Sequence, residues 1–116
     1  MAGEILGKVL FGEMTWPEVR DVDKDRVVLI PVGTLEGHGP HLPIDTDVLL
    51  VGEVCRLGAE KAPTEIVVLP PLVHGYSPHH MDFPGTVTIN WSTFVEYVLG
   101  YLQESRPSWV SEDADR

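Results

Sequence analysis

The stretch that decides the fold is an apolar run followed directly by a loop. It reads Val27-Val28-Leu29-Ile30-Pro31-Val32 and then Gly33-Thr34-Leu35-Glu36-Gly37-His38-Gly39-Pro40-His41-Leu42-Pro43-Ile44-Asp45-Thr46-Asp47. The run is continuous and rich in β-branched residues, which is typical of a strand covered on both faces in a parallel sheet. The loop holds too much glycine and proline for a helix, and it is dense in histidine and carboxylate side chains. We therefore expect a buried strand followed by a loop that contains functional side chains.

Three side chains of this loop are of the types that bind metal ions. Glu36 and His38 lie two residues apart, so in extended backbone their side chains point to the same side. Asp47 follows nine residues after His38, where the next helix is expected to begin. Two carboxylates and an imidazole suit Zn²⁺, Mn²⁺ or Fe²⁺. The residues alone leave a second interpretation open, a glycine-rich turn with Asp47 as the N-cap of the helix.

The segments after the loop complete a strand–helix–strand unit. Apolar spacing predicts a helix from Asp47 to Ala62, and the run Ile66-Val67-Val68-Leu69 predicts a second buried strand. Such a unit forms a right-handed crossover between parallel strands, whose carboxyl ends share one edge of the sheet. We therefore expect the loop around Glu36 and the segment 70–84 to face one another across one pocket.

The flanking segments give weaker predictions. Thr15 and Glu18 have the spacing of a capping box at the start of a short helix. The segment Thr86-Val87-Thr88-Ile89 alternates polar and apolar residues and predicts a shorter strand near an edge. A helix is expected from Ser92 to Ser105, ended by Arg106-Pro107.

Composition limits the classes of partner. The chain has 116 residues, enough for one domain, with 43% hydrophobic and 22% charged residues, as in ordinary globular proteins. A net charge of −10 argues against nucleic acid or an anionic membrane as partner. The lone Cys55 excludes an internal disulfide and favours a buried free thiol in a reducing cytoplasm. We also expect no signal peptide and no membrane-spanning segment.

The loop resembles the signature of the creatininase family, metal hydrolases related to creatinine amidohydrolase. That family shows Pro-x-Gly-Ser-x-Glu-Gln-His-Gly-x-His-Leu-Pro-x-x-Thr-Asp after its first strand, and here Thr34 and Gly37 replace Ser and Gln. A second block, residues 75–86, is similar to the family pattern Gly-x-Ser-x-Glu-His-x-x-Phe-Pro-Gly-Thr, with His79 in place of Glu. The lead-in Thr15-Trp16-Pro17-Glu18 is also similar to the family's amino-terminal segment.

The resemblance implies a fold and its extent. We expect a three-layer α/β/α sandwich with a mostly parallel sheet, truncated after the third strand and the helix that follows it. Residues 1–106 would be the amino-terminal part of a creatininase-like domain, and residues 107–116 an acidic tail that departs from the family, which continues into another buried strand. The chain is therefore interpreted as a truncated, frameshifted or split gene product.

The resemblance also implies a dinuclear site. A complete site would hold two divalent ions (Zn, Mn or Fe), with Glu36 on one ion, His38 on the other and Asp47 bridging the two. Ser77 and His80 match family positions near the substrate pocket. The implied reaction is hydrolysis of a non-peptide C–N bond, commonly in a cyclic amide, with a metal-bound hydroxide as nucleophile.

Expectations about activity and partners follow from the missing half of the family site. We expect the chain alone to be a poor catalyst, because part of the ligand set is absent. The expected partners are a small-molecule amide substrate and either further copies of the chain, as in a family-like homo-oligomer, or a complementary carboxy-terminal chain. Two alternatives stay open: a peptide-processing member of the same superfamily, and a non-enzymatic remnant or interaction module.

Overall fold

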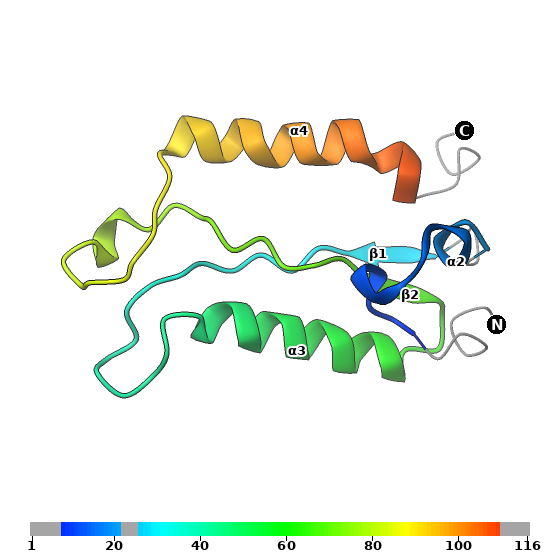
Figure 1. Ribbon diagram of the computed structural model, residues 1–116, viewed down its shortest axis with the longest axis horizontal. Helices are drawn as coiled ribbons and strands as arrows, with labels where there is room; N and C mark the ends of the chain where they lie inside the picture. Colours follow the sequence, from blue (N-terminus) through cyan, green and yellow to red (C-terminus); the bar gives the residue numbers. More distant parts are fainter. Residues whose placement is uncertain (1–7, 22–25, 110–116) are drawn as a thin grey trace.

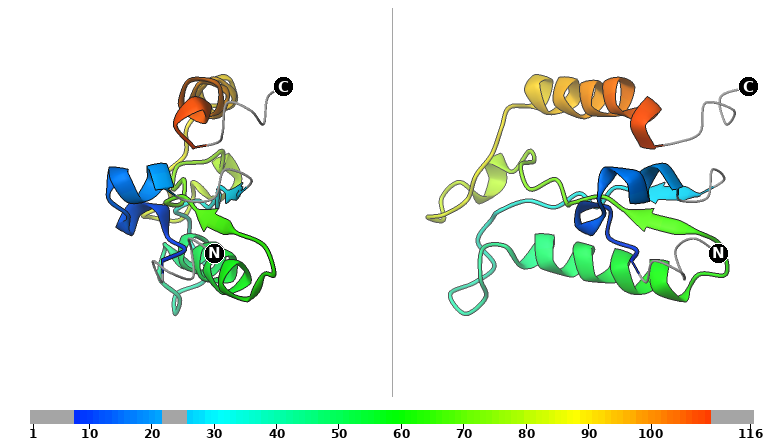
Figure 2. Two further views of the ribbon diagram at one scale, coloured as in Figure 1. Left: turned by 90° about the vertical axis from the view of Figure 1, so that its right-hand side faces the viewer. Right: turned by 45° about the vertical axis from the view of Figure 1, so that its right-hand side comes forward.

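A computed structural model of the chain describes residues 8–21 and 26–109. Two helices enclose two strands in three layers, with α4 on one side of the sheet and α3 on the other (Figure 1), and an end-on view gives the same order (Figure 2). The predicted α/β/α arrangement around a parallel sheet is therefore confirmed. In chain order the elements are the 3-10 turn η1 (Phe11–Glu13), α2 (Trp16–Asp21), β1 (Val27–Leu29), α3 (Thr46–Lys61), β2 (Ile66–Val68), the 3-10 turn η2 (Pro78–His80) and α4 (Trp91–Trp109).

The two strands pair in parallel, with Val28 opposite Val67 at the middle of the register. Both regular strands are shorter than predicted, although pairing continues beyond them: Leu72 N–H donates to Pro31 O at 2.9 Å and Gly33 N–H donates to Leu72 O at 2.8 Å. Proline lacks the N–H group that a ladder needs, and prolines stand at positions 31, 70 and 71. The prolines therefore end the regular strands, but the segments that follow β1 and β2 stay paired.

The prediction of a regular third strand over residues 86–89 is wrong. This segment forms an isolated parallel bridge between Gly75 and Thr88. The segment is hydrogen-bonded to the loop after β1 and to the segment after β2, because Val87 N–H donates to Leu35 O at 2.9 Å and Ile89 N–H donates to Gly75 O at 3.0 Å. The hydroxyl of Thr88 accepts the Ser77 N–H at 2.7 Å, so a side chain takes a donor that a longer ladder would use.

The helix boundaries follow the sequence except at two ends. The capping box before α2 is confirmed: Thr15 N–H donates to Glu18 Oε1 at 3.0 Å and Glu18 N–H donates to Thr15 Oγ1 at 3.4 Å. The N-cap of α3 is Asp45, not Asp47. The predicted end of the last helix is wrong, since α4 continues through Pro107 to Trp109. Proline removes a single helical hydrogen bond there, in the last turn, and does not stop the helix. The predicted acidic tail lies outside the described residues from position 110 onward.

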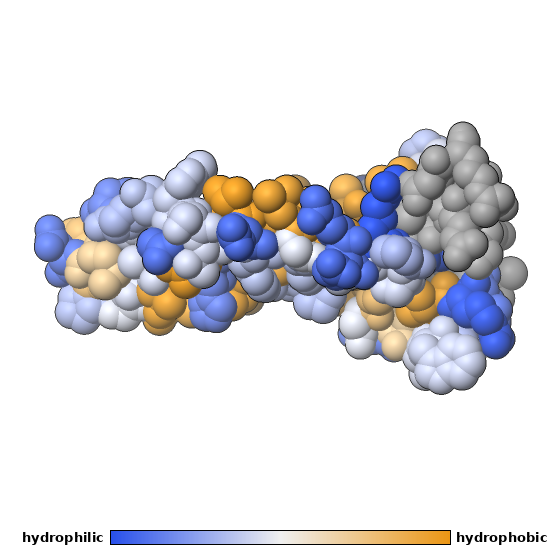
Figure 3. Space-filling view, turned by 90° about the horizontal axis from the view of Figure 1, so that it is seen from above, coloured by the Kyte–Doolittle hydropathy of each residue, from blue (hydrophilic) through white to orange (hydrophobic). Residues whose placement is uncertain are grey.

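The core is small and centred on β2. Its buried apolar residues are Ala59, Val67, Val68, Leu69 and Leu72. The apolar stripe expected on α3 is only partly covered, because Leu49 and Val54 are exposed, and Cys55 is half-buried instead of buried. Apolar patches also interrupt the polar surface on the α4 side of the molecule (Figure 3). Within the part of the chain that the structure describes, no helix has the length and apolar character needed to cross a bilayer.

One edge of the sheet is open. Val27 N–H donates to Glu65 O and Leu69 N–H donates to Leu29 O, so the odd-numbered residues of β1 direct their backbone groups toward β2. Alternation along a strand then turns the backbone groups of Val28, Ile30 and Val32 to the opposite edge. No strand within residues 8–21 and 26–109 pairs there. The far edge of β2, by contrast, is met by the amino-terminal segment, since Val68 N–H donates to Val9 O at 2.8 Å.

Candidate metal centre

The loop after β1 folds back on itself. Glu36 N–H donates to Ile44 O at 3.1 Å, and His38 and Leu42 form an antiparallel bridge. Gly39 at the tip has a φ of +70°, a left-handed conformation that glycine adopts without steric cost. This turn returns the chain so that α3 starts beside Glu36 and His38.

The structure brings the three predicted metal ligands together. Glu36, His38 and Asp47 each offer one ligand atom, and these atoms all lie within 4.8 Å of one another. His38 Nε2 lies 3.1 Å from Asp47 Oδ1 and 3.6 Å from Glu36 Oε1. Ligand atoms around a tetrahedral Zn²⁺ are separated by roughly 3.3 Å, given bonds of about 2.0–2.1 Å. The spacing therefore fits a divalent ion, and the roles of the three residues stay a prediction.

A buried nitrogen supports this fit. His38 Nε2 is inaccessible to solvent and makes no hydrogen bond to any described residue, although two carboxylates lie close to it. A buried polar atom without a partner is costly and needs an explanation. The nitrogen and both carboxylates converge on a common point, as ligands of one cation do.

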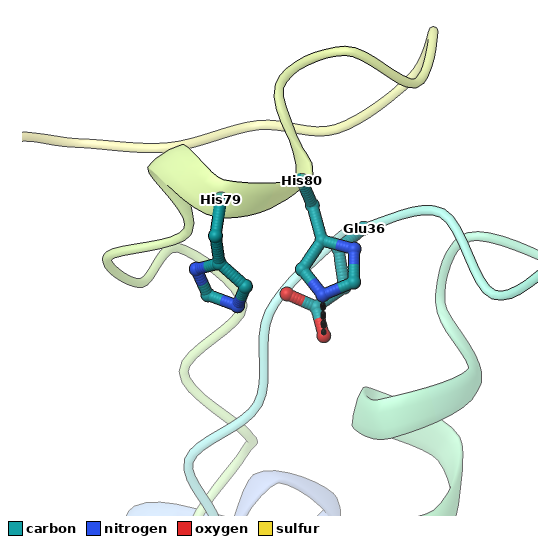
Figure 4. A group of neighbouring side chains, drawn as sticks. All are labelled: Glu36, His79 and His80. Carbon is teal, nitrogen blue, oxygen red and sulfur yellow. Dashed lines mark ion pairs between the residues drawn. The ribbon is translucent and has the colours of Figure 1, made fainter.

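Glu36 lies between two histidines. Its residue is 8% exposed, and its Oε1 is 3.6 Å from His38 Nε2 and 3.7 Å from His80 Nε2. His80 comes from η2, whose turn directs the imidazole toward the Glu36 carboxylate (Figure 4). The second motif block, residues 75–86, therefore contacts the loop after β1 through His80 and Glu36.

Ser77 holds the two motif blocks together. It is 2% exposed, and its hydroxyl is hydrogen-bonded to that of Thr34 at 2.8 Å. Thr34 comes from the loop after β1 and Ser77 from the segment after β2. The Ser77 hydroxyl is therefore engaged with another hydroxyl rather than with a histidine base, and a positioning role fits better than a nucleophilic one.

An open pocket of about 660 Å³ adjoins the cluster. Asp47 and Ser77 both line it, so the expectation that the two motif blocks face one pocket is confirmed. The other walls are largely apolar and include Leu50 from α3 and Trp91 from α4. Such a pocket suits a small molecule with one polar group directed at Asp47 and Ser77.

His79 is a candidate ligand that was not predicted from the sequence. Its ligand atom groups with those of Glu36 and His80 within 4.8 Å, and its ring centroid lies 4.4 Å from that of His80. The signal in the sequence is a second histidine directly before His80, at a position where the family pattern has Glu. His41, in contrast, is exposed and belongs to neither group of ligand atoms.

The fold and the site define an α/β/α domain that carries a Glu–His–Asp cluster at the carboxyl ends of parallel strands. The creatininase family model, described as creatinine amidohydrolase, matches residues 12–108. The chain belongs to the creatininase family.

Three relatives are named for different reactions. The mycofactocin precursor peptide peptidase of Mycolicibacterium smegmatis is 40% identical over 89 residues, which cover 73% of this chain and 36% of the relative. The creatinine amidohydrolase of Pseudomonas putida is 36% identical over 103 residues, covering 83% and 39%. The 3-dehydro-scyllo-inosose hydrolase of Thermotoga maritima is 35% identical over 96 residues, covering 81% and 30%. The chain thus spans between 30% and 39% of the length of these relatives.

Solved creatininase structures share the fold. A Zn–Zn form of a creatininase variant superposes with a TM-score of 0.78 at 34% identity, over 87% of this chain and 41% of that one. A Mn form of creatininase gives a TM-score of 0.76 at 34% identity, over 89% and 42%. The matched part is therefore somewhat less than half of each solved chain.

Proposed function

We propose that this chain supplies the amino-terminal half of a metal-dependent amidohydrolase of the creatininase type, which hydrolyses a non-peptide C–N bond of a cyclic amide. The convergence of Glu36, His38 and Asp47, with the unpartnered Nε2 of His38 at its centre, is the observation that carries this proposal. Zn and Mn forms of creatininase of the same fold support a divalent ion as cofactor.

Each residue has a distinct task in this proposal. Glu36 and Asp47 supply carboxylate oxygens and His38 supplies an imidazole nitrogen, a set that suits a hard or borderline divalent cation. Such a cation supplies Lewis-acid polarisation of the amide carbonyl and a water of lowered pKa. Ser77, fixed by Thr34, offers a hydroxyl to a polar group of the substrate, while the apolar wall at Leu50 and Trp91 covers its less polar side.

The carboxy-terminal part of the fold is needed for the proposed activity. If Asp47 is shared between two ions, each ion has only two protein donors among the three predicted ligands, below the three usual at a catalytic zinc site. The open edge of β1 and the exposed apolar side chains of both helices are surfaces that further strands and helices of the fold would cover. We expect turnover only when the carboxy-terminal part of the family fold is present, in the same polypeptide or as a complementary chain.

One alternative activity has specific support. The relative at 40% identity is a peptidase of a precursor peptide, so the same site in this chain would act on a peptide bond. The open pocket does not by itself distinguish a cyclic amide from a peptide end. A substrate panel containing creatinine, other cyclic amides and short peptides separates the two.

The test is complementation. Residues 1–116 are expressed alone and together with the part of the Pseudomonas putida creatinine amidohydrolase that lies beyond the matched region, and hydrolysis is measured with Zn²⁺ or Mn²⁺ added. We expect no turnover by the chain alone, and turnover of a cyclic amide by the pair. Glu36→Gln and His38→Ala should abolish it, whereas His41→Ala, in the same loop but outside the cluster, should retain it. Turnover by the pair that survives Glu36→Gln would overturn the proposal.

A further inference from the structure

We propose that Thr86 is a positioning residue for the predicted metal ligands, because its hydroxyl holds the backbone between Glu36 and His38. Gly37, the residue between these two, donates its N–H to Thr86 Oγ1 at 3.2 Å. Thr86 ends the second motif block, residues 75–86, and is not itself one of the candidate ligands. The inference rests on the proposed function, because it concerns how the predicted metal site keeps its shape.

Three consecutive residues of the loop after β1 are hydrogen-bonded to other parts of the chain. Leu35 O accepts the backbone N–H of the residue after Thr86 at 2.9 Å, and Glu36 N–H donates to Ile44 O at 3.1 Å. The third bond, from Gly37 to Thr86, differs from these two because its acceptor is a side chain. A substitution of Thr86 can therefore remove this bond and leave both backbone bonds in place.

Thr86 belongs to a tight turn that packs against the loop on both its outgoing and its returning part. Thr86 N–H donates to Phe83 O at 3.3 Å, which closes the turn, and Gly85 within it has a φ of +94°. A Cβ added at Gly37 would lie 2.9 Å from Cβ of Phe83, and one added at Gly85 would lie 3.2 Å from Cγ2 of Ile44. The turn therefore fits closely against the loop, and the Thr86 hydroxyl provides a polar contact within this packing.

The bond between Gly37 and Thr86 is shielded from water. Thr86 is 9% exposed and Gly37 is half-buried. An N–H group that loses its acceptor in such a place needs a new partner, and the backbone must turn to reach one. Glu36 and His38 lie on either side of this N–H, so a turn of the backbone changes the 3.6 Å separation of their ligand atoms. Groups that hold metal ligands in place typically contribute about 10–100-fold to the affinity for the ion.

The test is the affinity of the full 116-residue chain for Zn²⁺ and Co²⁺, measured by chelator competition without any activity assay. Thr86→Val has nearly the same shape but no acceptor, and we expect it to weaken binding by about 10–100-fold. Thr86→Ser retains the hydroxyl and should restore most of the affinity. The d–d absorption spectrum of bound Co²⁺ at saturation should also change in Thr86→Val and return in Thr86→Ser.

Thr88→Val is the matched control. Thr88 Oγ1 also accepts a backbone N–H, that of Ser77 at 2.7 Å, so this bond lies within the second motif block and its flank and not on the ligand loop. Both valine variants should therefore lose stability, whereas only Thr86→Val should lose metal affinity and change the Co²⁺ spectrum. Urea unfolding of the apo proteins measures the loss of stability separately, and circular dichroism checks that each variant is folded.

The outcomes separate this inference from the proposed function. Equal affinities and equal Co²⁺ spectra in the wild-type chain and Thr86→Val would overturn the inference and leave the proposed function standing. Equal losses of affinity in Thr86→Val and Thr88→Val would do the same, because they would assign the effect to general stability. Failure of the wild-type chain to bind either ion would overturn both.

Discussion

Nε2 of His38 lies 3.1 Å from Oδ1 of Asp47, yet no hydrogen bond joins them. His38 belongs to the loop after β1, and Asp47 to the first turn of α3. Two polar groups this close, held by different elements and out of hydrogen-bond geometry, have the spacing of two ligands of one cation.

The first prediction concerns Asp47. Asp47→Asn removes a charged ligand and should lower the affinity for Mn²⁺ by at least about tenfold, since even residues that only support ligands cost that much when changed. Asp45→Asn is the matched control, because Asp45 lies two residues away and makes no side-chain capping bond. Chelator competition measures both affinities, and equal losses in the two variants would show that only the general charge of the loop matters.

The second prediction concerns the bond between Thr34 and Ser77. Thr34→Val keeps the shape of the side chain but leaves the buried Ser77 hydroxyl without its partner, which should lower the free energy of unfolding by about 1–3 kcal/mol. Thr34→Ser restores the residue usual in the family and retains the hydroxyl, so its loss should be smaller. Urea unfolding measures both, and an unchanged stability in Thr34→Val would mean that this bond contributes nothing.

The third prediction compares two glycines. A Cβ at Gly37 would lie 2.9 Å from Cβ of Phe83, so Gly37→Ala should cost about 1–3 kcal/mol of unfolding free energy through overpacking. A Cβ at Gly58, inside α3, meets nothing within 4 Å, so Gly58→Ala should stabilise by roughly 0.5–1 kcal/mol through helix propensity. The midpoint temperature of thermal unfolding should therefore fall in Gly37→Ala and rise in Gly58→Ala. A rise in both variants would contradict the packing of Phe83 on the loop after β1.

The fourth prediction concerns pH. The backbone N–H of Thr15, and next the Lys8 ammonium at 3.0 Å, hold the pKa of Glu18 below its ordinary value of 4.5. The folded state thus binds this proton less readily than the unfolded state, so Glu18 contributes stability above pH 4.5 that is lost as pH falls through its folded pKa. Glu18→Gln should therefore be less stable than wild type at neutral pH, and the difference should vanish in acid below the folded pKa of Glu18. A difference that persists in acid would assign the effect to packing instead of charge.

The sequence predicts the parts of this fold that local patterns determine. The run from Val27, the helix that begins near Asp47 and the run from Ile66 have the composition of a buried strand–helix–strand unit, and the structure has that unit. The capping box at Thr15 and Glu18 was equally local. The Glu36–His38–Asp47 cluster followed from a loop signature that keeps its ligands within 12 residues of sequence, numbered 36 to 47.

What escaped prediction depends on distant partners. The segment 86–89 alternates like a strand, but its pairing is divided between Leu35 and Gly75, and neither offers a continuous edge. The end of α4 escaped because one proline in a last turn costs little. His79 meets Glu36 only because a 3-10 turn directs two neighbouring rings to one side, and no periodicity in the sequence reports such a turn.

The alternating backbone of β1 makes amide hydrogen exchange a record of whether the chain is alone. The amides of Val27, Leu29 and Gly33 face β2 and should exchange slowly, while those of Val28, Ile30 and Val32 face the open edge and should exchange quickly. A partner strand added at that edge would slow the second set and leave the first unchanged. In the free chain, slow and fast amide exchange should therefore alternate along β1. Slow exchange at every amide of β1 would show, for each residue, that a partner strand has paired with the open edge.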